Sequence, residues 1–184
     1  MKHDKPTITM HILPVSAIKP DLLDIDLKNT ALIVCSDDNN PFIKMFPYRL
    51  IIPFIDTTIK DRIGSITRRQ AKELLDFWDN RPSDVTDLYI CCTEGVSRSP
   101  AVAAAILRMS EKSDNPIWNN PYYSPNTLVY QTLCREAGVF APSWYLWMLK
   151  TNSIFRYKIS KARGNTGKYE RWQIIEFQKS KGQK

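Results

Sequence analysis

The chain has 184 residues, of which 43% are hydrophobic and 24% are charged, so it fits one globular domain with a buried core. No apolar run approaches the roughly 20 residues that span a bilayer, and the N-terminus lacks the apolar core of a signal peptide. The four cysteines show neither a disulfide framework nor Cys-x-x-Cys metal spacing, so we expect reduced thiols and a cytoplasmic location. The net charge is +7.

Strands and helices alternate along the hydrophobic pattern. Thr67 and Gln70 have the spacing of a capping box, with Ser65 as the alternative cap, which predicts the start of a helix that reaches about residue 80. Ser124 and Pro125 have the order of an N-cap followed by a first helical residue, and Gly138 would end that helix. Predicted strands cover 7–15, 30–35, 48–56 and 88–92, and the other predicted helices cover 99–111 and 142–150.

This alternation predicts an α/β fold, a three-layer arrangement with a mostly parallel central sheet flanked by helices. In such sheets the functional site lies beyond the carboxyl ends of the strands. Asp56 and Cys92 each end a predicted strand, so we expect the two side chains to face one crevice.

The positive charge is concentrated at the end of the sequence. Residues 1–150 carry 17 Lys and Arg against 17 Asp and Glu, whereas residues 151–184 carry 9 against 2. This asymmetry predicts a main domain over 1–150 and a basic extension over 151–184. β-favouring runs at 153–160 and 169–177 predict a β-hairpin in the extension, with a flexible tail as the alternative.

The segment around Cys92 has the features of a phosphate site. Arg98 follows Cys92 by six positions, where an Ala-rich helix begins, and Gly95 allows a tight bend between them. The N–H groups of such a loop and helix N-terminus converge on an anion, which also favours the thiolate form of a cysteine there. Arg98 can hold two phosphate oxygens. The predicted phosphate-binding loop comprises Thr93, Glu94, Gly95, Val96, Ser97 and Arg98.

Residues 92–100, CTEGVSRSP, resemble the signature loop of the cysteine-dependent (Cys-x5-Arg) phosphatases, especially dual-specificity and small bacterial tyrosine phosphatases. Residues 125–133 are similar to a C-terminal helical segment of the bacterial members. The resemblance implies a phosphatase-like catalytic domain over 1–150. It also implies hydrolysis of phosphotyrosine, with phosphoserine or phosphothreonine as further substrates, through a phosphocysteine on Cys92. Neither a metal nor a cofactor is implied.

The same chemistry needs a carboxylic acid that protonates the leaving group. Asp56 follows an apolar strand and precedes two threonines, which resembles the general-acid loop of dual-specificity phosphatases, and Asp61 is the alternative. Ser99 would donate a hydrogen bond to the departing thiolate, or is a plain first-turn hydroxyl. The predicted catalytic residues are therefore Cys92, Arg98, Asp56 and Ser99.

Several alternatives stay open. Cys91 stands where the family has histidine and is either a core residue or a redox partner of Cys92. The substrate is a phosphorylated protein or peptide, but the resemblance also covers RNA 5′-triphosphatases and phosphoinositide phosphatases. Loss of catalysis would leave a phosphate-binding module. The extension would bind a nucleic acid or an anionic membrane, or only add solubility.

Overall fold

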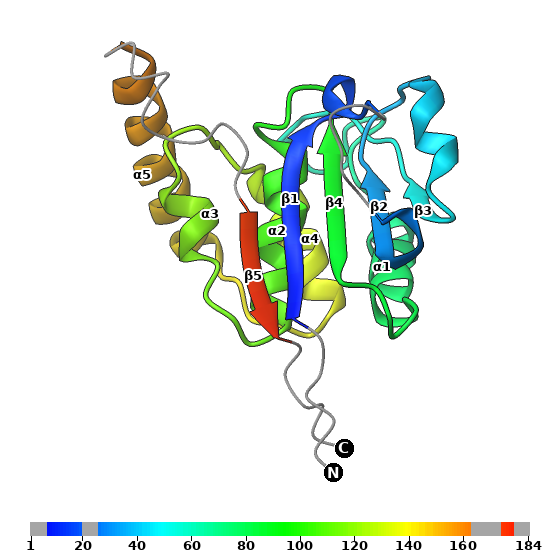
Figure 1. Cartoon of the computed structure of the whole chain (residues 1–184). Helices are drawn as coiled ribbons and strands as arrows, with labels where there is room; N and C mark the ends of the chain where they lie inside the picture. Colours follow the sequence, from blue (N-terminus) through cyan, green and yellow to red (C-terminus); the bar gives the residue numbers. More distant parts are fainter. Residues whose placement is uncertain (1–6, 20–25, 163–173, 179–184) are drawn as a thin grey trace.

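The computed structural model describes residues 7–19, 26–162 and 174–178 (Figure 1). Its centre is a five-stranded sheet in the order β3-β2-β4-β1-β5. Neighbouring strands among β1 to β4 run parallel, and β5 pairs antiparallel with β1 at one edge, so the predicted α/β fold with a mostly parallel sheet is confirmed. The strands are β1 (Thr7–Pro14), β2 (Thr30–Val34), β3 (Tyr48–Ile51), β4 (Asp87–Cys92) and β5 (Ile174–Gln178).

The two faces of the sheet are covered differently. Helices α1, α2 and α4 lie against one face and enclose the main core (Figure 1). A smaller core on the other face contains Leu13, Val34, Phe46 and Tyr89, with residues of short 3-10 helices above it. The helices are α1 (Arg68–Asp79), α2 (Arg98–Met109), α3 (Asn115–Asn119), α4 (Thr127–Glu136) and α5 (Ser143–Ala162), and the 3-10 helices are η1 (Val15–Ala17), η3 (Leu27–Asn29) and η4 (Pro41–Met45). No helix of the described residues is long and apolar enough to cross a bilayer.

The predicted capping box is present at the start of α1. The Thr67 Oγ1 accepts a hydrogen bond from the Gln70 N–H at 3.2 Å, and the Gln70 Oε1 accepts one from the Thr67 N–H at 3.0 Å. These bonds satisfy N–H groups that the first turn of a helix leaves unpaired. Ala71, Leu74 and Trp78 form the buried face of the helix, as the apolar spacing predicts.

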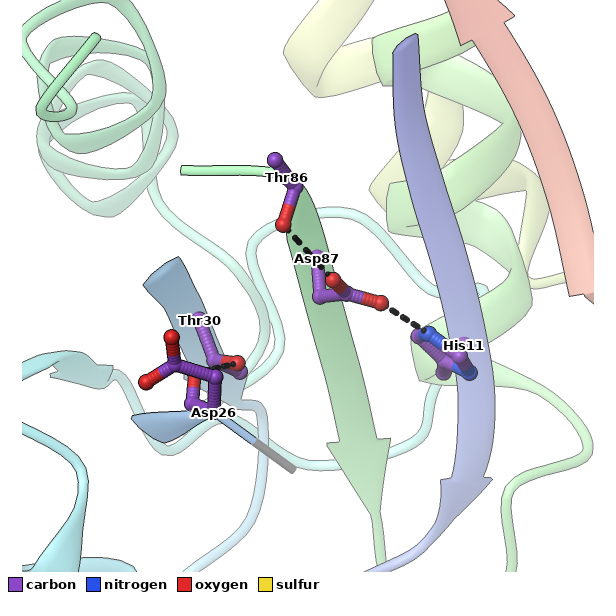
Figure 2. A network of polar contacts seen from close by, with 5 residues as sticks. All are labelled: His11, Asp26, Thr30, Thr86 and Asp87. Carbon is purple, nitrogen blue, oxygen red and sulfur yellow. Dashed lines mark hydrogen bonds and ion pairs between the residues drawn. The ribbon is translucent and has the colours of Figure 1, made fainter. Parts of the chain in front are cut away.

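A small polar network joins the beginning of β4 to β1 (Figure 2). The His11 ring lies 2.8 Å from an Asp87 carboxylate oxygen, and the other Asp87 oxygen accepts a hydrogen bond from Thr86. His11 also stacks on Tyr89 with ring centroids 4.2 Å apart. Asp87 begins β4 whereas Cys92 ends it, so this network fixes the strand at the end that lies away from Cys92.

The predicted strand at 48–56 is wrong over its second half. β3 ends at Ile51, because Pro53 has no N–H group with which to continue a ladder. The predicted cap at Ser124 and Pro125 is also wrong. Asn126 caps α4 instead, since its side-chain oxygen accepts hydrogen bonds from the backbone of Leu128 and Val129.

The predicted hairpin in the extension is wrong as well. Residues 153–160 belong to α5, in which Ser153 is buried and donates a 2.8 Å hydrogen bond to the Tyr123 carbonyl. Tertiary packing thus overrides the β propensity of that run. Part of the second run forms β5, which pairs with β1, while residues 169–173 lie outside the described residues. The predicted boundary at residue 150 falls within α5, and the division into two parts stays a prediction.

Candidate active site

Cys92 ends β4 with 2% of its surface exposed, and the loop after it leads into α2. Gly95 in this loop has φ +68°, a conformation that side chains disfavour. A Cβ atom there would lie 2.7 Å from the Pro14 nitrogen and 2.8 Å from the Leu13 carbonyl carbon. The loop therefore packs directly on the end of β1, and only glycine fits at this position.

Arg98 is held by backbone carbonyls from two other segments. Its Nη1 donates to the carbonyls of Cys35 at 3.0 Å and Phe54 at 2.8 Å, and its Nη2 donates to the Thr93 hydroxyl at 2.8 Å. Nε is buried and has no hydrogen-bond partner among the described residues. A buried guanidinium nitrogen is normally paired. The edge formed by Nε and Nη2 thus suits an oxyanion that accepts two parallel hydrogen bonds.

Ser99 lies beside Cys92. The Ser99 Oγ is 3.1 Å from the Cys92 Sγ, and Ser99 is fully buried in the first turn of α2. When Cys92 is a thiolate, the hydroxyl is the only donor of this pair. The position suits a group that stabilises the thiolate, although the role itself stays a prediction.

The side chains of two separate segments bring Asp56 to the loop. The Asp56 Oδ1 accepts hydrogen bonds from the Ser97 hydroxyl at 2.8 Å and from the Asn126 amide at 2.7 Å. Asp61, the alternative acid, is exposed, has φ +60°, and pairs only with Lys60 at 3.8 Å among the described residues. The geometry therefore favours Asp56 over Asp61 as the acid that acts at Cys92.

Asn126 is a site residue that sequence reasoning missed, although residues 125–133 carried a family resemblance. Besides Asp56, its amide donates to the Thr57 carbonyl at 3.0 Å, while its oxygen caps α4. The backbone N–H groups of Ser124 and Asn126 donate to the carbonyls of Val96 and Ser97. One short segment thus contacts both the predicted phosphate-binding loop and Asp56.

Lys150 is the second residue that the sequence did not indicate. Its Nζ donates to the carbonyls of Ser124 and Pro125, each at 2.9 Å, and to the Ser124 hydroxyl at 3.0 Å. Burial lowers the pKa of Lys150, and the negative charge of nearby Asp56 opposes that shift. No local pattern marks this lysine, because α5 brings it to the site from far along the chain.

The remaining cysteines near the site are buried in the core. Cys91 packs in the smaller core, on the opposite face of the sheet from Cys92, as alternation along a strand requires. Burial raises the pKa of both Cys91 and Cys35. A protonated, buried thiol is a poor nucleophile, so the placement favours the core interpretation of Cys91 over the redox one.

The remaining loop residues are less enclosed. Thr93 and Glu94 are exposed, and Val96 and Ser97 are half-buried. Thr93 supports Arg98, and Ser97 supports Asp56, through the hydrogen bonds given above.

Among solved structures, this fold is similar to that of DUSP15. The TM-score is 0.52 at 16% identity, over 88% of this chain and 93% of DUSP15. The likeness covers most of both chains and shows that the two share a fold. Tk-PTP in its active form and PTPMT1 in complex with PI(5)P have TM-scores of 0.38 each, at 18% and 14% identity. The match to Tk-PTP covers 70% of this chain and the match to PTPMT1 covers 72%, and each covers 81% of the other chain. No family model and no curated protein matches this sequence.

Proposed function

We propose that this protein is a cysteine-dependent protein phosphatase that hydrolyses phosphotyrosine, with phosphoserine and phosphothreonine as further substrates. The observation that carries the proposal is the hydrogen bond between Asp56 and Ser97, which places a carboxyl group beside the Cys92–Arg98 loop. A nucleophile, an anion-binding loop and a proton donor are the three parts that such a reaction needs.

In the first step, the Cys92 thiolate attacks phosphorus, and an S–P bond forms as the P–O bond to the leaving group breaks. Asp56 gives its proton to the departing oxygen. Arg98 and the N–H groups of the loop hold the three other phosphate oxygens as their charge redistributes. The tether of Arg98 to two backbone carbonyls keeps the guanidinium in place through the reaction.

In the second step, water attacks the phosphocysteine and the S–P bond breaks. The Asp56 carboxylate now takes a proton from that water, which returns the acid to its starting state. Ser99 donates a hydrogen bond to the thiolate as it departs, from a hydroxyl that lies 3.1 Å from the sulfur. Both steps balance without a metal or a redox partner.

Three alternative functions are less well supported. An RNA 5′-triphosphatase or a phosphoinositide phosphatase would use the same loop, and no contact of the described residues favours either. A phosphate-binding module without catalysis needs Arg98 but has no use for a carboxyl group that two side chains hold at the loop. We therefore propose a phosphorylated protein or peptide as the substrate.

A nucleic acid or anionic membrane bound by residues 151–184 is a separate partner proposal, and much of that segment lies outside the described residues.

Turnover of an aryl phosphate by the full chain, with a metal chelator present, tests the proposal. We expect hydrolysis that vanadate inhibits and that Cys92→Ser lowers at least about 10⁴-fold, because the nucleophile is lost. Rapid quench and mass spectrometry should trap a phosphocysteine in the wild type. Hydrolysis that persists in Cys92→Ser, or that requires an added metal, contradicts the proposal.

A further inference from the structure

A groove of about 1250 Å³ lies beside the Asp56 loop. Side chains of residues 58–68, α4 and α5 line the groove, which is open to solvent. The proposed reaction makes no use of this space.

The groove shares its walls with the active site. Thr58 lies two positions after Asp56, and Thr127 follows Asn126, the residue that holds Asp56. Lys150 lines the groove and also binds the carbonyls of Ser124 and Pro125. A substrate whose phosphate sits on the Cys92–Arg98 loop therefore has the groove as the adjoining space for the residues that flank the phosphate.

The lining is strongly basic. Five cationic side chains face one acidic residue, Asp61; the cations are Lys60, Arg62, Arg68, Arg135 and Lys150. Arg68 pairs with Glu136 at 3.0 Å, and Lys60 lies 3.8 Å from Asp61. Arg62 and Arg135 are exposed and form no ion pair with any described residue. Two guanidinium groups in the groove thus remain available for acidic groups of a ligand.

The groove also has apolar surface that small anions do not need. Ile63 is 96% exposed and Trp147 is 72% exposed, and both contribute to the lining. Large exposed apolar side chains next to charged ones are typical of surfaces that bind polypeptides. This combination of cationic and apolar side chains in the groove favours a peptide with both acidic and apolar side chains over a free inositol phosphate.

We propose that this groove binds the acidic segment that flanks the phosphorylated residue of a protein substrate. The inference rests on the proposed phosphatase function and specifies its substrate class. Arg62 and Arg135 pair with Asp or Glu carboxylates of the segment, and Ile63 and Trp147 cover its apolar side chains. The groove therefore affects KM for peptides and leaves the chemistry at Cys92 unchanged.

The test compares three probes on the full chain: an aryl phosphate, a phosphotyrosine peptide with Asp and Glu flanks, and the same peptide with Asn and Gln. We expect the wild type to prefer the acidic peptide about tenfold in kcat/KM, through KM. The double variant Arg62→Gln, Arg135→Gln should lower this preference about fivefold, from about tenfold to about twofold, since exposed ion pairs contribute only modestly to binding. Aryl phosphate turnover should stay the same.

Arg69→Gln is the matched control, because Arg69 is an exposed arginine of α1 that does not line the groove. A charge reversal, Arg62→Glu with Arg135→Glu, should shift the preference towards a peptide with Lys flanks. This gain of activity is a readout that misfolding cannot produce.

The outcomes separate the two proposals. Without aryl phosphate turnover by the wild type, the proposed function itself is wrong. With turnover but equal rates on both peptides, or with the same loss in Arg69→Gln, the groove inference is overturned. It is also overturned if an inositol phosphate or an RNA 5′-triphosphate is a better substrate than the acidic peptide and depends on Arg62 and Arg135.

Discussion

The Cys92–Arg98 loop is held by backbone packing and buried contacts, whereas Asp56 is held by two side-chain hydrogen bonds near the surface. The loop is pressed against the end of β1 at Gly95, and Arg98 is fixed to the carbonyls of Cys35 and Phe54. Asp56 is exposed and depends on Ser97 and Asn126, which are 41 and 70 positions away in the chain.

This difference implies that substitutions in the Cys92–Arg98 loop and substitutions around Asp56 have different effects. A change at a packed position of the loop, such as Gly95, must disturb the packing of the loop on β1, so it should affect both stability and the proposed phosphate binding. A change around Asp56 only frees an exposed carboxylate, so it affects the rate while the fold and the anion site persist. The following variants test that distinction, from the largest expected effect on the rate to the smallest.

Asp56→Asn should lower kcat for an alkyl phosphate or phosphotyrosine about 10²–10⁴-fold, because the leaving oxygen no longer receives a proton. A substrate with a strongly acidic leaving group should lose much less, since its anion departs without protonation. Steady-state kinetics over a leaving-group series measures this contrast.

Asp61→Asn is the control for the acid, because Asp61 has the same side chain on the same segment but no contact with the loop. Its activity should remain within about twofold of the wild type, as expected for an exposed surface change. A larger loss in Asp61→Asn than in Asp56→Asn would reverse the assignment of the acid.

Gly95→Ala should disturb the loop, because the new Cβ meets the Pro14 nitrogen at 2.7 Å and φ is positive. We expect a loss of about 2–4 kcal/mol in the free energy of unfolding, and about a 10²-fold loss of kcat/KM from a displaced anion site. Chemical denaturation and aryl phosphate kinetics measure the two effects.

Gly138→Ala is the control for Gly95→Ala, because it introduces the strain of a positive φ without a steric clash. Gly138 has φ +72°, but nothing lies within 4 Å of its Cβ position. It should cost about 1 kcal/mol of stability and no activity. Equal losses in the two variants would mean that the close approach of the loop to β1 is unimportant.

Ser99→Ala should slow the second step more than the first, because the departing thiolate loses a hydrogen-bond donor at 3.1 Å. A bond to a charged group contributes about 1.5–3 kcal/mol, so we expect a rate loss of about ten- to a hundredfold. Pre-steady-state kinetics should then show a burst of leaving group as phosphocysteine accumulates. If the burst is absent and the formation of phosphocysteine is the slowed step, Ser99 acts only on the structure of the loop.

Asn126→Ser keeps an oxygen that caps α4 but is too short to reach either Asp56 or the Thr57 carbonyl. Together with Ser97→Ala it should lower kcat about tenfold, and the lost bond to Thr57 should cost about 1–2 kcal/mol of stability. A double-mutant cycle with Asp56→Asn tests whether Asn126 and Ser97 act through Asp56. Additive losses in the cycle would show that they do not.

Much of the fold was predictable because its signals are local. The capping box of α1, the apolar run of β2 and the small residues of α2 each depend on neighbours a few positions apart. The hydrophobic pattern runs past the end of β3, which Pro53 marks, and the Ser124–Pro125 pair lies two residues before the true cap of α4. The β-favouring run at 153–160 became helical, because a helix there packs Ser153 against Tyr123.

The sequence by itself predicted a phosphate-binding loop, because Cys92, Gly95, Arg98 and the start of α2 lie within seven consecutive positions. Their geometry follows from a strand, a tight turn and a helix N-terminus, which are all local structures. Only the tertiary structure gave a reason to favour Asp56 over Asp61, and only it brought Asn126, Lys150 and the basic groove to the site. The contact between Asn126 and Asp56 joins residues 70 positions apart, so it depends on how the elements pack and leaves no periodic pattern in the chain.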